Sequence, residues 1–550
     1  MHPVELDWWS ASQVLEAGAR YGFSIDGGAP IPDPRARRQP EGPTGPSEVF
    51  DPATIEWTDH GWKGLPLSGS VLYQIDATSC TAAGTLDAAI ERLRSVAELG
   101  VEVVCLGAAG PRHPTQAKGE STSRGDVLAG LSAAGEAFGG PLGLARFVDA
   151  CHARGLAVVL DLHWPSLTAP DHLLAGRAGY LSDTYLTAWG AGLNLDGPDS
   201  DEVRRTLIDT VLGWLVDFHL DGVRLLAADE LRDTGAVPFL EQLSQAIDQL
   251  TDESGRQLWL LVDSQRNDPR VITDRANGGW GAQAQSAPDV GVTIRNALHD
   301  RAPGAAVEAT DLEVLAICLS NPFPHAGRWS ATQRRTVGRP IDPAHTPGWR
   351  YLVAEPSSGL GVLAPESERM QRLICAATLL LTSPYTPILR MGQEWGEPWA
   401  DERGGELTGD PARRATRARG EGAEGAAAPA TVNWASRRKE PHAALLRWYK
   451  ALLALRAARP DLRDHDLTAI SVALDEATSA LVVHRGHHRV ALNLGSELVR
   501  VPLELPAEPR CVVLLATDPT ARIEDDGALA LEPNGVVIVG PTRPRRDSTG

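Results

Sequence analysis

The sequence predicts an α/β protein: a (β/α)8 TIM barrel, with a partial N-terminal β-sandwich segment before it and a C-terminal all-β domain after it. The chain has 550 residues, which exceeds one ordinary domain but suits a barrel with additional segments. Short apolar runs alternate with amphipathic helical patterns over residues 69–460. Short segments of alternating polarity follow over residues 461–540, and they predict a β-sandwich.

Residues 1–68 predict part of a β-sandwich and a linker. Strand and turn signals occur in Tyr21-Gly-Phe-Ser-Ile and Asp26-Gly-Gly, and a Pro/Gly-rich run continues to Ser47. This segment is too short for a complete sandwich. The N-terminus has neither the basic start nor the apolar core of an export signal, so we expect a cytoplasmic protein.

The barrel elements are expected in chain order from Val71. Helix 199–219 is the clearest of them, because Val203, Leu207, Val211 and Leu215 recur at helical spacing. It leads into a fourth strand within residues 218–230. The other expected strands are 71–75, 101–106, 156–162 and 258–263, with 314–319 and 388–391 as candidates for strands seven and eight. The other expected helices are 84–98, 142–154 and 440–458.

Three segments are expected to lie outside regular structure. Residues 107–137 and 401–431 are rich in small or charged residues and predict mobile loops, and 541–550 predict a disordered tail.

Composition excludes several classes of protein. A net charge of −19 does not suit nucleic-acid binding, and no apolar run approaches the roughly 20 residues that a membrane span needs. The six cysteines are scattered, without a C-x-x-C pair, and are interpreted as buried free thiols. No cofactor or metal is predicted. Fifteen tryptophans could include sugar-stacking platforms, although most are expected to be packed in the core.

The stretch Asp221-Gly-Val-Arg224-Leu225-Leu226 is the centre of the functional prediction, because it delivers side chains from a buried strand to the barrel mouth. With it, several motifs in this order resemble the malto-oligosyltrehalose trehalohydrolase family, a branch of the α-amylase-like glycoside hydrolase family 13. These motifs are Gly139-Gly-Pro, Cys151-His-Ala-Arg-Gly-Leu, Asn194-Leu-Asp-Gly-Pro, Asn267-Asp-Pro-Arg, Met391-Gly-Gln-Glu394-Trp-Gly and Asn433-Trp.

The resemblance implies both an activity and a set of positions. Members of the family cleave the α-1,4 bond next to a terminal trehalose unit. They use two carboxylates about 5–5.5 Å apart as nucleophile and general acid/base, and a third acid holds the distorted sugar. Leu226 falls at the nucleophile position, and a leucine cannot attack an anomeric carbon. Asp263 falls at the general-acid position, where the family has glutamate.

Further positions of the same site also differ from the family pattern. The third acid aligns with Phe323, and the histidine before it aligns with Pro322. On the third strand Asp161 is retained, while Ser166 stands at a position of histidine.

Other residues are predicted to bind substrate or to support the site. Trp164 and Trp280 are candidate sugar contacts, and Arg224 is expected to pair with Asp263 or with Asp161. Glu394 is interpreted as a structural feature of the family. A shifted register that makes Asp229 or Glu230 the nucleophile is the weaker alternative, because strand geometry fixes which side chains reach the mouth.

These substitutions predict a non-catalytic, trehalohydrolase-like protein of α-glucan and trehalose metabolism, which binds maltooligosaccharides or an enzyme of the trehalose pathway. The first alternative is an active trehalohydrolase, a retaining α-glycosidase that uses an unrecognised acid pair. The second alternative is a decayed scaffold without a ligand. No nucleic-acid or membrane partner is expected, and the sequence does not indicate the oligomeric state.

Overall fold

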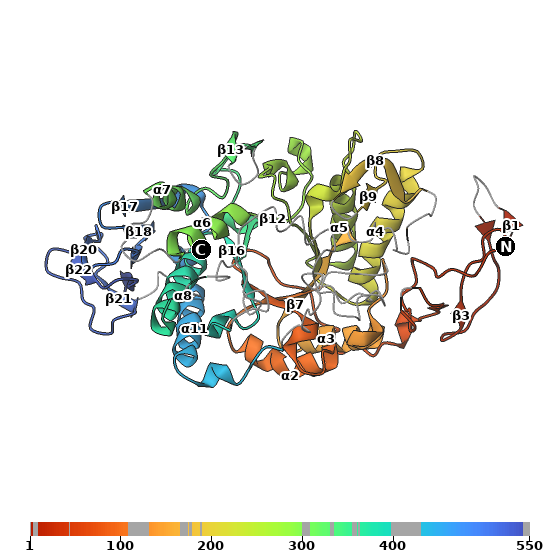
Figure 1. Ribbon diagram of the computed structural model, residues 1–550, viewed down its shortest axis with the longest axis horizontal. Helices are drawn as coiled ribbons and strands as arrows, with labels where there is room; N and C mark the ends of the chain where they lie inside the picture. The colour runs from red at the N-terminus through yellow and green to blue at the C-terminus, as the bar shows by residue number, and fades with distance from the viewer. Residues whose placement is uncertain are drawn as a thin grey trace.

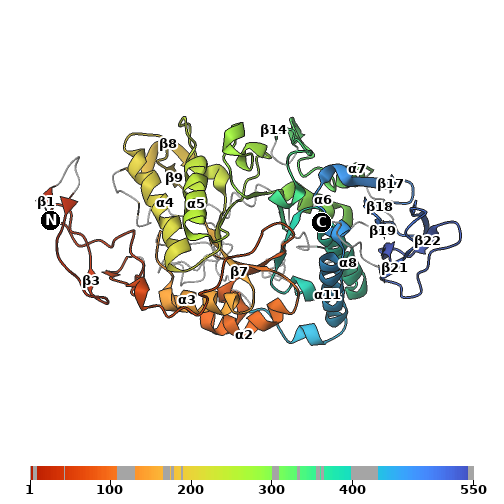
Figure 2. The same ribbon diagram turned by 180° about the vertical axis from the view of Figure 1, so that it is seen from behind.

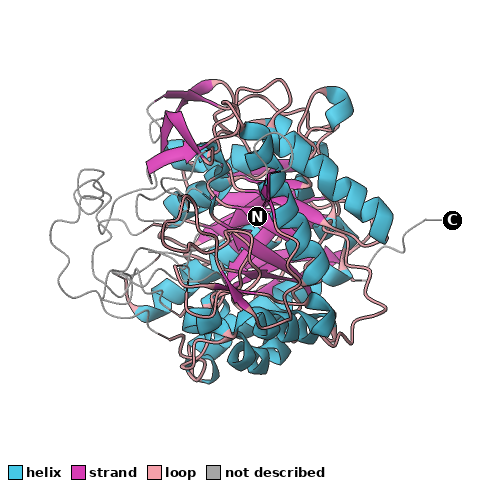
Figure 3. Cartoon of the chain, turned by 90° about the vertical axis from the view of Figure 1, so that its right-hand side faces the viewer, coloured by secondary structure: helices cyan, strands magenta, loops and turns pink. Residues whose placement is uncertain are grey.

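Eight parallel strands form a closed barrel at the centre of the molecule (Figures 1 and 3). The computed structural model describes residues 2–542 apart from 4–8, 43, 108–130, 165–173, 175–178, 188–189, 300–308, 331–334, 355–359, 361–363 and 398–430. In chain order the barrel strands are β5 (Leu72–Ile75), β6 (Val103–Leu106), β7 (Ala157–Leu162), β10 (Gly222–Leu225), β11 (Trp259–Val262), β12 (Ala284–Ser286), β15 (Tyr351–Ala354) and β16 (Thr386–Arg390). The predicted TIM barrel is therefore confirmed.

Helices surround the barrel, and Figure 3 shows them in cyan around the magenta strands. They include α2 (Leu86–Ala97), α3 (Gly140–His152), α4 (Ser200–Asp217), α5 (Phe239–Ser254), α6 (Pro288–Leu298), α7 (Ala309–Cys318), α8 (Glu366–Leu381) and α11 (His442–Ala458). Alternate residues of each strand face these helices, and the others fill the barrel. The side chains that fill it include Leu72, Val103, Cys105, Ala157, Val159, Trp259, Leu261, Leu352 and Ile388.

Two strands differ from the sequence prediction. Residues 314–319, expected as strand seven, lie in and just after helix α7, so that prediction is wrong. The physical reason is the spacing of its buried residues: Leu312, Leu315 and Leu319 are buried at intervals of three and four, whereas Ile317 is 43% exposed. Strand seven is β15, and the short strand β12 is the sixth.

The N-terminal segment lies at one end of the molecule and the C-terminal β-domain at the other (Figures 1 and 2). The all-β C-terminal domain is confirmed. Its five-stranded sheet contains β17 (Ile470–Asp475), β18 (Ala480–Arg485), β19 (His488–Asn493), β23 (Val536–Pro541) and β21 (Cys511–Ala516). A second sheet pairs β20 (Val499–Pro502) with β22 (Ala528–Leu531), and apolar side chains from both sheets form one cluster.

The N-terminal segment forms only short pairs of strands within its described residues. Two-residue strands pair β1 (His2–Pro3) with β2 (Trp9–Ser10) and β3 (Arg20–Tyr21) with β4 (Ser47–Glu48). Ion pairs from Arg35 to Asp209 and from Arg37 to Asp217 connect this segment to helix α4. Among the described helices, none is long and apolar enough to cross a membrane.

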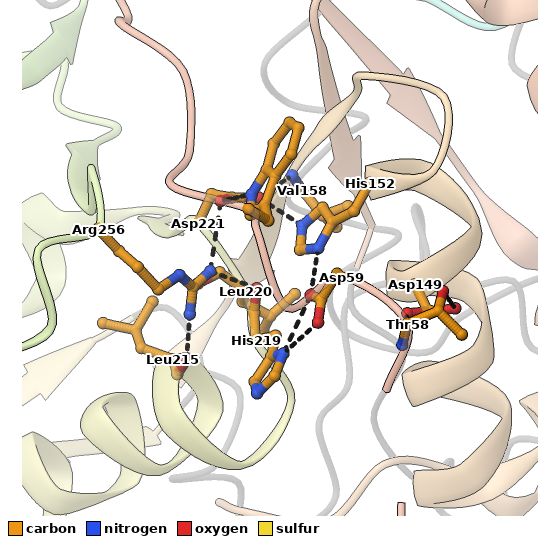
Figure 4. Close-up of polar contacts among 11 residues, drawn as sticks. Thr58, Asp59, Asp149, His152, Val158, Leu215, His219, Leu220, Asp221 and Arg256 are labelled. Carbon is orange, nitrogen blue, oxygen red and sulfur yellow. Dashed lines mark hydrogen bonds and ion pairs between the residues drawn. The ribbon is translucent and has the colours of Figure 1, made fainter. Parts of the chain in front are cut away.

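Strand β10, which carries the motif around Arg224, is anchored at its N-terminal end by Asp221 (Figure 4). This carboxylate is fully buried and accepts hydrogen bonds from Trp62 Nε1 at 2.7 Å, the Val158 amide at 2.7 Å, His152 Nε2 at 3.0 Å and Arg256 Nη2 at 3.3 Å. Four donors satisfy a charge that would otherwise be costly to bury.

The linker residues 57–62, called here the base strap, complete this network. Asp59 lies 2.7 Å from His152 Nδ1 and 3.0 Å from His219 Nδ1 (Figure 4). Burial acts to raise the pKa of Asp59, but the hydrogen bonds from the two histidines lower it below its usual value. Trp57 stacks on His219, with ring centroids 3.8 Å apart. The base strap thus connects α3 to the segment just before β10 at the base of the barrel.

Candidate active site at the barrel mouth

The motif arginine and the retained aspartate form a buried ion pair inside the barrel. Arg224 of β10 lies beside Asp161 of β7 in register, and its Nε and Nη2 donate to the two Asp161 oxygens at 2.8 and 2.6 Å. Both side chains are buried. Burial alone would lower the pKa of Arg224, but the carboxylate of Asp161 raises it above its usual value, so the guanidinium stays charged. Of the two predicted partners, Asp161 makes the bond.

Leu226 follows the last residue of β10, at the mouth of the barrel. Its amide donates to the Leu162 carbonyl at 2.8 Å, which continues the pairing with β7 by one residue. It lies two positions beyond Arg224, so strand alternation turns both side chains toward the barrel axis. The side chain is half-buried. The position that the family gives to a nucleophile is therefore occupied here by an aliphatic group.

Asp263 occupies the corresponding place on the neighbouring strand. It follows β11, its amide donates to the Leu225 carbonyl at 2.8 Å, and its side chain is half-buried. Its charge acts on both Asp161 and His163, which places these groups in one electrostatic cluster. Burial lowers the pKa of His163, and Asp263 opposes this effect. One carboxylate thus lies at the ends of β10 and β11 where the retaining mechanism needs two.

The carboxylates that follow Leu226 in the chain have other partners. Asp229 accepts hydrogen bonds from Ser264 Oγ at 2.7 Å and from the Gln265 amide at 2.8 Å, and so it fixes the loop after β11. Glu230 lies 4.0 Å from Arg232. Neither arrangement favours the shifted register in which one of these acids replaces the nucleophile.

The third-acid assignment is corrected by the structure. Phe323 and Pro322 follow helix α7 and not a barrel strand. Phe323 is fully buried and packs edge-on against Tyr351, with ring centroids 5.2 Å apart, in the layer between the strands and the outer helices. These two residues therefore do not line the mouth. The residues that follow the true seventh strand, 355–359, lie outside the described part of the chain.

Two predicted sugar contacts have different environments. Trp164 is 1% exposed and packs against Phe239 of α5, so its role is in the core and the prediction that it binds substrate is wrong. Trp280 is half-buried, and the Arg270 guanidinium lies 5.7 Å from its ring centroid. Trp280 remains a prediction, although Arg270 already contacts the ring. Ser166 lies outside the described residues.

Glu394 follows strand β16 and lies next to Tyr73, whose side chain faces outward from the barrel. The Tyr73 hydroxyl donates to Glu394 Oε1 at 2.9 Å, and the Gly392 amide donates to Oε2 at 3.1 Å. Burial raises the pKa of Glu394 to about 7. This site agrees with the structural role that the sequence suggested.

The raised pKa of Glu394 predicts a pH-dependent stability. The folded protein favours the protonated carboxyl, so this contribution is complete below the ordinary pKa of 4.5 and is lost as the pH rises through about 7. In urea unfolding, Glu394→Gln should reduce the fall in unfolding free energy between pH 5 and pH 8 by on the order of 2–3 kcal/mol. The exposed Glu440→Gln is the matched control. An unchanged pH dependence in Glu394→Gln would contradict the assignment.

The eight-stranded barrel, the buried Arg-Asp pair and the acid at the end of β11 define the chain as an α-amylase-like glycosidase barrel. The chain belongs to the malto-oligosyltrehalose trehalohydrolase family. It is 38% identical to the malto-oligosyltrehalose trehalohydrolase of Arthrobacter ramosus, over 90% of this chain and 89% of that protein. The proteins of the same name from Mycobacterium tuberculosis and Rhizobium sp. are 36% and 33% identical, over 90% and 95% of this chain and 89% and 90% of theirs.

Solved structures agree with this fold. A Salmonella typhimurium protein described as an alpha amylase superposes with a TM-score of 0.75 and 26% identity, covering 96% of this chain and 91% of that chain. A pullulanase from Anoxybacillus, crystallised with maltotetraose, reaches a TM-score of 0.67 at 14% identity, covering 93% of this chain and 77% of its own, which supports the fold alone. No family model matches the chain.

Proposed function

We propose that this protein binds α-1,4-linked glucan chains at the mouth of its barrel and does not hydrolyse them by the retaining mechanism of its family. Leu226 carries this proposal. It stands where the nucleophilic carboxylate would attack the anomeric carbon, and its side chain has neither a lone pair nor a charge.

The remaining charged groups do not replace the missing nucleophile. Asp161 is held by two hydrogen bonds from Arg224, and Asp229 is held by the loop after β11. Asp263 is left as a single acid with a side chain one methylene shorter than glutamate. A displacement of about 1 Å at a reacting group can reduce the rate about a hundredfold.

The choice of ligand is supported by sequence similarity to named relatives. The relatives that share nine-tenths of this chain are named for an activity on malto-oligosyltrehalose, which is a maltooligosaccharide ending in trehalose. Because the barrel strands and the Arg224–Asp161 pair are retained, we infer that a chain of this class is also the ligand here.

A second candidate function is an active trehalohydrolase with an acid pair that the described residues do not reveal. The same similarity over nearly the whole chain supports it, because each of those relatives carries the name of the active enzyme. The two candidates share a ligand and differ in whether the glycosidic bond breaks.

Two measurements on the purified protein separate these candidates. Incubation with maltotriosyltrehalose, followed by chromatography of the products, should show no trehalose, whereas calorimetric titration with maltoheptaose should show binding. Trehalose release that disappears in Asp263→Asn would instead establish the active enzyme. The absence of both trehalose and binding heat at millimolar sugar would exclude both candidates and favour a scaffold without a carbohydrate ligand.

A further inference from the structure

One tryptophan differs from all others in the described part of the chain. Trp329 is 62% exposed, whereas the other tryptophans whose side chains the structure describes are buried or half-buried. Transferring an indole from water to an apolar contact is favourable by roughly 2–3 kcal/mol. An indole that leaves more than half of its surface in water therefore suggests a binding surface.

The hairpin that carries Trp329 holds it outward. Strand β13 (Arg328–Ser330) pairs with β14 (Arg335–Val337), with Trp329 opposite Thr336 and Arg328 opposite Val337. Val337 is 6% exposed, so the end of the hairpin that carries it packs on the protein. Alternation along the strand then directs Trp329 and Thr336 to the opposite face. The exposure of the indole agrees with this register.

The hairpin belongs to the rim of the barrel mouth. It lies in the connection between β12 and β15, and the Arg339 amide just after it donates to the Asn267 carbonyl at 3.0 Å. Asn267 is four residues beyond Asp263, and its side-chain amide donates at 2.6 Å to Asp289, at the start of α6. Figure 1 shows β13 at the upper edge of the molecule. The indole and the acid are thus presented by neighbouring loops at the same end of the barrel.

We propose that Trp329 is a stacking platform for a glucose ring of an α-1,4-glucan chain that extends from the barrel mouth. This inference rests on the proposed function, because it names a binding residue for the same ligand. The C–H face of a glucose ring is apolar and flat, and it matches an exposed indole in size, while the ring hydroxyls stay in water.

The surroundings of Trp329 favour a sugar over a protein as the occupant. A stable protein interface buries about 1,200–2,000 Å² and has an apolar centre. Within the described strands of this hairpin, Trp329 is the only exposed large apolar side chain, and its described neighbours Arg328, Arg335 and Thr336 are polar and exposed. A single indole in a polar setting suits a narrow carbohydrate chain.

Calorimetric titration with maltoheptaose tests this platform in the full chain. Trp329→Ala should weaken binding about tenfold, because one ring contact is lost, whereas Trp329→Phe keeps an aromatic face and should weaken it by no more than about threefold. Leu498→Ala is the matched control, because Leu498 is 60% exposed but lies in the C-terminal domain; it should bind as the wild type does. Circular dichroism confirms that each variant is folded.

The possible failures are distinguishable. If the wild type binds maltoheptaose and Trp329→Ala binds it equally well, the platform is wrong while the proposed function stands, and the indole serves another contact such as a protein. If the wild type itself shows no binding heat, the proposed function and the platform both fail.

Discussion

Replacement of Asp221 by asparagine is expected to lower the free energy of unfolding by about 3–5 kcal/mol, as for other broken buried ion pairs. The carboxylate accepts four hydrogen bonds from the linker, α3, β7 and the segment before β11. Asparagine offers one acceptor oxygen and one NH2 group, so at least one donor loses its partner and the NH2 group faces other donors. Arg256 and His152 would also lose the charge that they now face.

Urea unfolding followed by circular dichroism measures this loss. The matched control is Asp209→Asn, which removes the same charge from an exposed pair with Arg35, where the side chains are 42% and 46% exposed. Exposed pairs contribute about 0–1 kcal/mol, so the control should change little. Equal effects of the two substitutions would show that Asp221 is not the anchor of strand β10.

Restoring a carboxylate at position 226 alone is expected to leave hydrolysis of maltotriosyltrehalose at background. Leu226→Asp places an acid next to Arg224, but Asp263 remains one methylene too short for the general-acid role. The double variant Leu226→Asp with Asp263→Glu supplies both carboxylates of the retaining pair, and the general acid regains the side-chain length that the family has. We expect its trehalose release to exceed that of the single variant by about a hundredfold, which is the cost of a displacement of about 1 Å.

The measurement is the initial rate of trehalose release from equal amounts of folded protein. The matched control is Asp263→Glu alone, which lacks the nucleophile and should remain inactive. If Leu226→Asp alone is as active as the double variant, the length of Asp263 is not limiting. If the double variant stays at background, other parts of the site have diverged as well, and the mouth is unsuited to the reaction for reasons beyond these two residues.

The fold could be predicted from the sequence because its signals are local. The helix around Val203 and Leu207 and the apolar strand before Asp161 are evident from spacing and composition alone. Strand seven could not be recognised in this way. Residues 314–319 and 351–354 are both short apolar runs, and only the burial pattern of Leu312, Leu315 and Leu319 distinguishes the helix from the strand.

The candidate site was predicted where a motif fixes the register and was mistaken where none does. Arg224 fixes Leu226 two residues later, and Asn267 fixes Asp263 four residues earlier, so both lie at strand ends as expected. Phe323 had no such anchor, and its assignment failed with the strand that it depended on. Trp329 was missed because the exposure of one tryptophan among fifteen depends on hairpin register, which composition does not reveal.

The position of the base strap has a consequence for how this protein can change. Asp221 and Leu226 are five positions apart and flank strand β10, yet the first is buried in a network at the base of the barrel and the second lies at the opposite opening. Structural integrity and chemistry are therefore assigned to separate ends of the same segment. Arg224 between them is neutralised by Asp161, so exchanging a carboxylate for leucine at position 226 leaves no buried charge without a partner. Such a barrel can lose or regain a reaction at its opening while the buried network at its base, which stabilises the fold, stays unchanged.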